Sequence, residues 1–269
     1  ASATATFTLA GTSNVSLTSI DASGLSSDLV MTGVTTATAA DVTLGSGDNS
    51  VTIALADGVR DALNIDGGNG TDTMVMAELV NTDYRPGLVN LETLDLDLAA
   101  TMGGAGTMNL ADADSVATIE LDLDSGDENF TVSNASVTSY VLEATMFATT
   151  DILTLGSGTT LTVSNGAATG GTAGSSTLTV ATPDATTLTL AQGHGSEINA
   201  ATLTAAAATT INFGGTAVDA NGDDWAGAMR VETLSAAELL TLNVDSSQGA
   251  RTIDTLTAAK ATTVTAVGD

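Results

Sequence analysis

Residues 184–190 read DATTLTL, a turn residue followed by Ala and Thr and then by Leu residues that alternate with Thr. The same order recurs three times near the end of the chain, as NAATLTA at 199–205, AAATTINF at 206–213 and AKATTVTA at 259–266. Alternation with a period of two residues is typical of a β-strand that buries one of its faces. Each of these stretches is therefore predicted to be a short strand that begins at a turn.

The same alternation extends over the rest of the chain, at residues 6–9, 51–55, 91–98, 117–123, 161–163, 177–180 and 239–244. Short strands that recur about every 10 residues, two or three to a turn, fit a repeating rung of roughly 20 to 30 residues. The sequence thus predicts an all-β fold, an irregular right-handed parallel β-helix or β-roll-like solenoid with calcium-binding turns. An antiparallel β-sandwich is the alternative.

No shift in composition divides the 269 residues, so one continuous β-solenoid region is expected over 1–269. The turn-forming stretch NTDYRPG at 81–87 is a possible seam, and the Gly- and Ser-rich stretch at 164–176 is a possible long loop. Because the chain begins at Ala1 within the alternating pattern, we expect a fragment of a larger secreted chain.

The charge balance limits the partners of the chain. Five basic residues stand against 32 acidic ones, a formal net charge of −27. Nucleic acids and anionic membrane surfaces require Lys and Arg, so neither is an expected partner. No run of 18 apolar residues occurs, so membrane insertion is not expected. With no cysteine to form disulfides, rigidity is expected from a large core or from bound metal, and divalent cations are the efficient counter-ions for the carboxylates.

A glycine-rich stretch at 65–73, IDGGNGTDT, leads directly into the strand-forming Met-Val-Met. Residues 67–75 match the calcium-binding β-roll pattern G-G-x-G-x-D-x-U-x. Glycine allows the positive φ angles that turn backbone carbonyls inward, and Ca²⁺ binds carbonyl and carboxylate oxygens. A calcium site is therefore predicted at Asp66, Gly67, Gly68, Asn69, Gly70, Thr71 and Asp72. A plain tight turn is the alternative.

Three further stretches are degenerate relatives of this corner, and they raise the expected number of Ca²⁺ ions to several. In LGSGDNSVT at 44–52, Asn49 stands where the pattern has its key Asp. The candidate ligands are Gly45, Gly47, Asp48 and Asn49 in this stretch, Asp124, Asp127 and Glu128 in the second, and Asp219, Asn221, Asp223 and Asp224 in the third. Asp, Asn and Gly are also the ordinary residues of turns, so a turn without metal is the alternative at each.

These features resemble the RTX-type, type-I-secreted proteins of Gram-negative bacteria, especially the S-layer proteins and large adhesins. The resemblance rests on GGNGTDTMVM at 67–76, on VNLETLDL at 89–96 with its echo MRVETLSA at 229–236, and on LTSIDASG at 17–24 with its echo LNVDSSQG at 242–249. It implies an extracellular solenoid at the cell surface that folds in calcium. It also implies assembly with copies of itself and, through Ca²⁺, contact with anionic cell-surface polysaccharide.

The expected function is therefore that of a structural cell-surface protein, a calcium-dependent, self-assembling S-layer component. The alternative is a calcium-rigidified adhesin or biofilm-matrix module that binds a surface ligand. Catalysis is not expected. Carboxylate pairs such as Asp95 and Asp97 share one face of a strand. However, sugar-cleaving sites also need aromatic and basic residues, and this chain is 3% aromatic with five Lys and Arg.

Overall fold

A computed structural model describes most of the chain, namely residues 4–8, 18–36, 40–55, 63–79, 83–98, 104–113, 115–123, 129–144, 151–158, 160–165, 178–192, 198–216, 229–247 and 249–268. Every regular element within these residues is a β-strand. In this part of the chain no helix has the length and apolar character needed to cross a membrane.

The strands form three sheets. The largest has twelve strands, in the order β1 (Thr4–Thr8), β3 (Asp28–Thr36), β5 (Ser50–Leu55), β7 (Thr73–Leu79), β10 (Thr93–Leu98), β12 (Thr118–Leu123), β14 (Ser139–Ala144), β16 (Thr160–Asn165), β18 (Thr187–Gln192), β20 (Thr210–Thr216), β22 (Thr241–Asp245) and β24 (Thr263–Val267). The second has four strands, β2 (Ser19–Asp21), β4 (Ala40–Thr43), β6 (Leu63–Asp66) and β9 (Gly87–Val89). The third has eight strands, β23 (Arg251–Thr257), β21 (Met229–Ser235), β19 (Ile198–Thr204), β17 (Thr179–Ala181), β15 (Ile152–Leu155), β13 (Asn129–Ser133), β11 (Ala105–Asn109) and β8 (Asp83–Tyr84).

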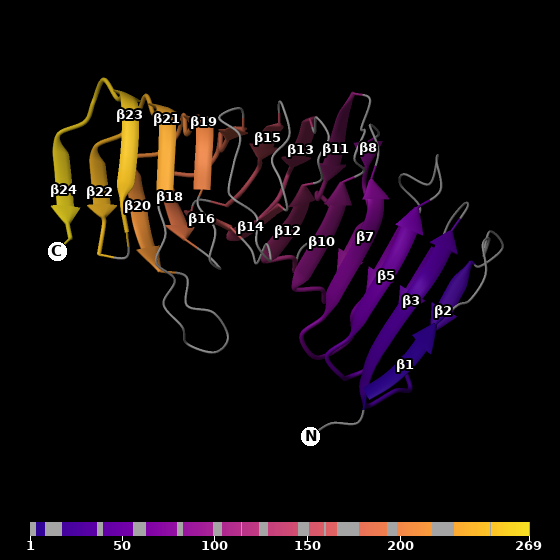
Figure 1. Cartoon of the computed structure of the whole chain (residues 1–269). Helices are drawn as coiled ribbons and strands as arrows, with labels where there is room; N and C mark the ends of the chain where they lie inside the picture. Colours follow the sequence, from indigo (N-terminus) through magenta and orange to yellow (C-terminus); the bar gives the residue numbers. More distant parts are fainter. Residues whose placement is uncertain are drawn as a thin grey trace.

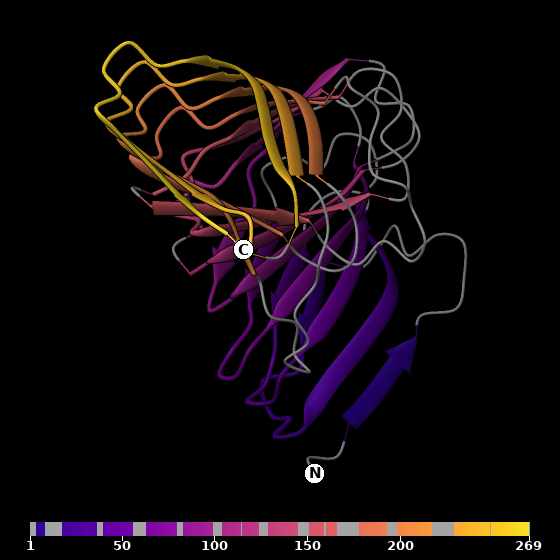
Figure 2. The ribbon, with the colours of Figure 1, turned by 60° about the vertical axis from the view of Figure 1, so that its left-hand side comes forward.

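Neighbouring strands are parallel, and each strand pairs with the equivalent strand of the next rung (Figure 1). A rung takes 20 residues between the paired residues Thr73 and Thr93, and 31 between Thr210 and Thr241. This confirms the predicted all-β parallel solenoid. The parallel pairing excludes the antiparallel sandwich. Figure 2 shows the strands of each sheet following one another along the stack.

The twelve-stranded sheet runs through the whole stack, while the sheet that completes each rung changes near residues 83–89. There β8 is the edge strand of the eight-stranded sheet, and β9 is the edge strand of the four-stranded one. The change at 83–89 overlaps the turn-forming stretch at 81–87. Across it β7 pairs with β10 in the twelve-stranded sheet, so the described residues form one stack. Of the expected loop at 164–176, Ser164 and Asn165 are strand residues paired with β14, and the rest lies outside the described residues.

The core lies between the sheets because alternate residues of each strand point inward. In β10 the buried positions are Leu94, Leu96 and Leu98, and the residues between them are half-buried. Equivalent residues of successive rungs form rows along the stack. One such row, entirely buried, is Val51, Met74, Leu94, Ile119 and Tyr140. The alternation seen in the sequence thus builds one continuous apolar core.

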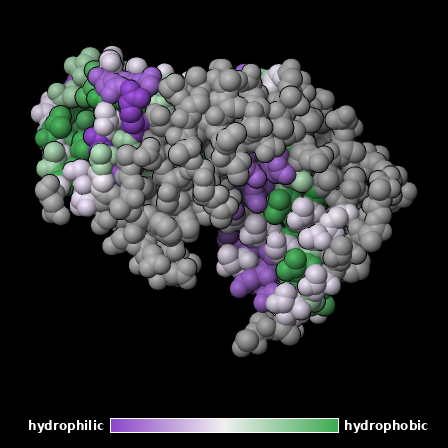
Figure 3. All heavy atoms as spheres, in the orientation of Figure 1, coloured by the Kyte–Doolittle hydropathy of each residue, from purple (hydrophilic) through white to green (hydrophobic). Residues whose placement is uncertain are grey.

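The C-terminal rung exposes apolar side chains. Leu256 on β23 and Val264 and Val267 on β24 are 39%, 63% and 59% exposed. In Figure 3 hydrophobic surface accordingly appears at the left-hand end, next to hydrophilic surface.

An ion pair also joins neighbouring rungs near this end of the stack. Arg230 on β21 forms it with Asp254 on β23.

Candidate functional site

Two glycine-rich corners lie one above the other in successive rungs. The first corner, residues 44–49, joins β4 to β5, and the second corner, residues 67–72, joins β6 to β7. Two backbone hydrogen bonds hold them together. Asn69 N donates to Gly45 O at 3.2 Å, and Thr73 N donates to Asn49 O at 2.8 Å. Since Ser50 pairs with Thr73, Asn49 and Asp72 occupy equivalent positions.

The glycines allow these backbones to approach closely. A Cβ atom on Gly45 would lie 2.0 Å from Leu25 O in the rung before, and one on Gly68 would lie 2.0 Å from Gly45 O. Gly68 and Gly70 also have φ angles of +88° and +131°, which side-chain-bearing residues rarely adopt. The glycine pattern therefore has a structural cause in the stacking of carbonyls against the next rung.

Three corner carboxylates accept backbone N–H groups from a neighbouring rung. Asp28 Oδ1 accepts from Asp48 N at 3.1 Å, and Asp48 Oδ1 accepts from Thr71 N at 2.9 Å. Glu92 Oε2 accepts from Asp72 N at 2.8 Å. Bonds from backbone N–H to a carboxylate are stronger than neutral ones. These acids thus tie successive corners together.

Asn49 and Asp72 form the centre of the site. Both are buried, with exposed fractions of 2% and 0%. Asn49 Nδ2 lies 2.7 Å from Asp72 Oδ1, 2.7 Å from Gly47 O and 3.3 Å from Gly67 O. Asn49 Oδ1 accepts from Leu29 N at 3.1 Å, which fixes the orientation of the amide. The backbone N of Asn49 also donates to Asp72 Oδ1, at 2.8 Å.

The second carboxylate oxygen of Asp72 is different. Asp72 Oδ2 is buried and has no hydrogen-bond partner within the described residues. Burial raises the pKa of Asp72. The hydrogen bonds from Asn49 act against this and lower the pKa, whereas the nearby carboxylates of Glu92 and Asp48 raise it further. A buried polar atom without a partner carries a desolvation cost of about 1–3 kcal/mol.

The donor set decides whether Ca²⁺ fits this corner as the residues stand. Ca²⁺ takes six to eight oxygen ligands at about 2.3–2.6 Å. Here the point on which Gly47 O, Gly67 O and Asp72 Oδ1 converge is filled by the amide nitrogen of Asn49, which bears hydrogens and cannot bind a cation. The residues therefore do not form an open oxygen cage. Among the described residues, no group of three or more His, Cys, Asp and Glu is arranged to hold a metal ion.

A hydrogen-bonded turn that the sequence reasoning missed recurs at two corners. Asp66 Oδ1 accepts from Gly68 N at 3.0 Å and from Asn90 Nδ2 of the next rung at 2.9 Å. Likewise, Asn109 Oδ1 accepts from Ala111 N at 3.1 Å and from Asn134 Nδ2 of the next rung at 3.0 Å. Both donor asparagines have positive φ angles, 52° for Asn90 and 55° for Asn134. Asparagine tolerates this conformation, so an Asn directly after a predicted strand is the feature of the sequence that could have indicated this turn.

The two pairs of echoed stretches behave differently. In LTSIDASG and LNVDSSQG, Asp21 and Asp245 accept from the backbone N and the hydroxyl of Ser23 and Ser247, at 3.0 and 2.6 Å in both. The serine hydrogen bonds lower the pKa of both aspartates. This echo is therefore a shared turn. By contrast, VNLETLDL passes through a corner at Asn90, whereas most of MRVETLSA forms the single strand β21.

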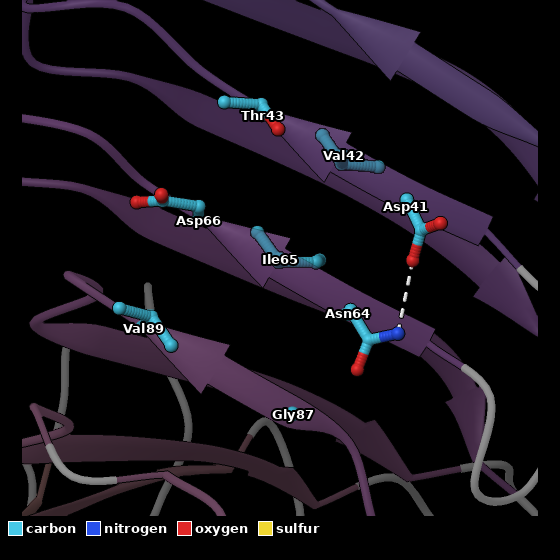
Figure 4. A pocket seen from close by; sticks show the side chains of 8 residues that line it. All are labelled: Asp41, Val42, Thr43, Asn64, Ile65, Asp66, Gly87 and Val89. Atoms are coloured by element: carbon cyan, nitrogen blue, oxygen red, sulfur yellow. Dashed lines mark hydrogen bonds between the residues drawn. The ribbon is translucent and has the colours of Figure 1, made fainter.

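An open groove lies on the outer face of the four-stranded sheet (Figure 4). Figure 4 shows Asn64 pointing towards Asp41, and Asn64 Nδ2 donates to Asp41 Oδ1 at 2.9 Å. Val89, 54% exposed, adds an apolar side chain beside the polar side chains of Asp41, Asn64 and Asp66. The residues that line the groove are Asp41, Val42, Thr43, Asn64, Ile65, Asp66, Gly87 and Val89.

Carboxylates also form rows on the twelve-stranded sheet. The register places Asp95 beside Glu120 and Asp97 beside Asp122 in neighbouring strands. Neighbouring strands are about 4.8 Å apart, and like charges that face each other across strands are destabilising. Burial also raises the pKa of Glu120. The two rows therefore bring like charges together in neighbouring rungs of this sheet.

The other predicted ligands lie outside the described residues. They are Asp124, Asp127, Glu128, Asp219, Asn221, Asp223 and Asp224. No protein-family model, no curated protein and no solved structure matches this chain.

Proposed function

We propose that this protein is a structural, non-catalytic component of an extracellular layer, an S-layer that assembles in calcium on the surface of a Gram-negative-type bacterium. The observation that carries the proposal is the uninterrupted stack: one twelve-stranded parallel sheet and one apolar core extend through the described residues. In such a solenoid each rung is bonded to the next, and stiffness accumulates along the stack. A stiff, elongated unit suits a layer that must keep its spacing.

The charge of the chain supports a role for calcium between molecules. Copies with a net charge of −27 repel one another at close range unless cations lie between them. The rows of Asp95 with Glu120 and Asp97 with Asp122 supply oxygen ligands at the surface. Ca²⁺ sites of extracellular proteins have dissociation constants of about 10⁻⁴–10⁻³ M, so they fill outside the cell. The same ions bridge to anionic cell-surface polysaccharide.

The second candidate is a calcium-rigidified adhesin or biofilm-matrix module, and the groove on the four-stranded sheet favours it. Its lining combines the carboxylates of Asp41 and Asp66 with the amide of Asn64 and the exposed Val89. Hydroxyl-rich ligands such as polysaccharides are bound by side chains of this kind, directly or through Ca²⁺.

One titration distinguishes the two candidates. Dilute protein is titrated with CaCl₂, and in parallel with MgCl₂ and with NaCl at equal ionic strength, and each sample is examined by light scattering and electron microscopy. The S-layer proposal expects ordered sheets or filaments with millimolar calcium only, which disperse when a chelator is added. Protein that stays monomeric in millimolar calcium contradicts it. Calcium-dependent binding of the monomer to isolated cell-surface polysaccharide then supports the adhesin.

A further inference from the structure

The amide of Asn49 occupies the place in the stacked corners where a cation would be expected. Its Nδ2 atom is surrounded by Asp72 Oδ1, Gly47 O and Gly67 O, all within 3.3 Å. Three oxygens around one centre, one of them a carboxylate, are an arrangement that attracts positive charge. The two hydrogens of the amide supply partial positive charge to this centre.

The register explains why an amide stands there. Asn49 is the equivalent of Asp72 in the rung before, so the first corner has an amide at the position where the second has a carboxylate. Two carboxylates at these positions would face each other in a buried space. The exchange of one carboxylate for an amide turns that repulsion into a hydrogen bond of 2.7 Å.

We infer that the Asn49 side chain replaces a cation in this corner, so that the corner closes without calcium, and that the same oxygens become a divalent-cation site when position 49 carries a carboxylate. An oxygen in place of Nδ2 would lie 2.7 Å from Asp72 Oδ1 and Gly47 O, too close unless these oxygens move apart around a cation that binds them. The resulting donors are all oxygens, including two carboxylates and two backbone carbonyls, which is the chemistry that Ca²⁺ prefers. The other carboxylate oxygen keeps the role of Asn49 Oδ1 as acceptor for Leu29 N.

The test compares the wild type with N49D in chelator and in CaCl₂, at protein concentrations too low for assembly. In chelator N49D should melt at a lower temperature than the wild type. Calcium at about 100 times the dissociation constant should then raise its melting temperature by about 5–10 °C more than that of the wild type. The matched control is N109D, which adds the same charge away from the two glycine-rich corners and keeps an oxygen for the hydrogen bonds from Ala111 N and Asn134 Nδ2. It should respond to calcium as the wild type does.

A second measurement follows the wild-type corner directly. The two side-chain NH₂ resonances of Asn49 should be protected from hydrogen exchange in chelator and should not shift when calcium is added. Resonances that shift or lose protection with calcium overturn the inference. A calcium response of N49D equal to that of N109D also overturns it, as does an N49D chain that stays unfolded in calcium. Because these readouts concern the isolated molecule, failure of calcium-dependent assembly leaves them unaffected.

Discussion

Gly45→Ala tests whether the corners are stacked as closely as the structure places them. The added Cβ would lie 2.0 Å from Leu25 O, a backbone atom that cannot move aside alone. Because Gly45 does not have a positive φ angle, the effect is steric and does not include backbone strain. Relief requires the first corner to move about 1 Å away from Leu25, which weakens the bond from Ser46 N to Leu25 O and displaces Gly45 O from its bond with Asn69 N of the next rung.

The expected loss follows from these two causes. Overpacking costs about 1–3 kcal/mol, and each weakened hydrogen bond about 0.5–1.5 kcal/mol. The free energy of unfolding should therefore fall by about 2–6 kcal/mol. Denaturant unfolding followed by circular dichroism measures it, in chelator so that calcium contributes nothing. Gly24→Ala is the control, because nothing lies within 4 Å of its added Cβ, and it should stay within about 0.5 kcal/mol of the wild type. If both variants change equally little, the close stacking of the corners is refuted.

Three further substitutions address the core and the charged sheet surface. Tyr140→Phe removes the donor of a 2.6 Å bond to the carbonyl of the buried Gly156, so denaturant unfolding should show a loss of about 1–3 kcal/mol; no loss would mean that water replaces the hydroxyl. Thr182→Val keeps the shape of the side chain but removes a buried hydroxyl that has no hydrogen-bond partner in the described residues. The melting temperature should therefore rise by about 2–4 °C, and a fall would contradict the absence of a partner for this hydroxyl. Burial raises the pKa of folded Glu120, so its proton is bound more tightly in the native state and its ionisation lowers stability as the pH rises through the folded pKa. Glu120→Gln should thus stabilise the protein at pH 7 and lose that advantage as the pH falls below the unfolded value, as measured by melting curves over that range; an advantage that does not depend on pH would exclude the charge as its cause.

The rungs were predictable because their signal is local. Alternation within a strand such as β10 depends on which side chains face the core, and each strand of the stack repeats this requirement. Rung length could be bounded but not fixed, because corners of different length stack on one another. The rung that passes through Glu92 has a shorter corner than the rung before it, yet Glu92 still accepts the N–H of Asp72.

The chemistry of the corners was less predictable because it depends on contacts between rungs. The motif at 67–75 predicted Asp72 as a calcium ligand, and in the structure its buried carboxylate accepts a hydrogen bond from Asn49. The role of Asn49 depends on the register that brings it beside Asp72, and the sequence of the first corner alone does not contain this information. Likewise, the similar stretches at 89–96 and 229–236 form different structures because the first passes through a corner.

A stacked corner turns backbone carbonyls and carboxylates towards a narrow space, and their negative charge has to be balanced within it. At the corner of Asp66 the balance comes from backbone N–H groups and the amide of Asn90, and at the corner of Asp72 it comes from the amide of Asn49. A cation is a third solution, and unlike an amide it depends on the surroundings of the protein. Since each rung contacts only its neighbours, corners of different kinds can coexist in one stack. Corners closed by amides would keep the fold intact when calcium is scarce. Under the proposed function, calcium would then act mainly at the carboxylate rows on the surface. Loss of the ion there would separate the molecules without unfolding them.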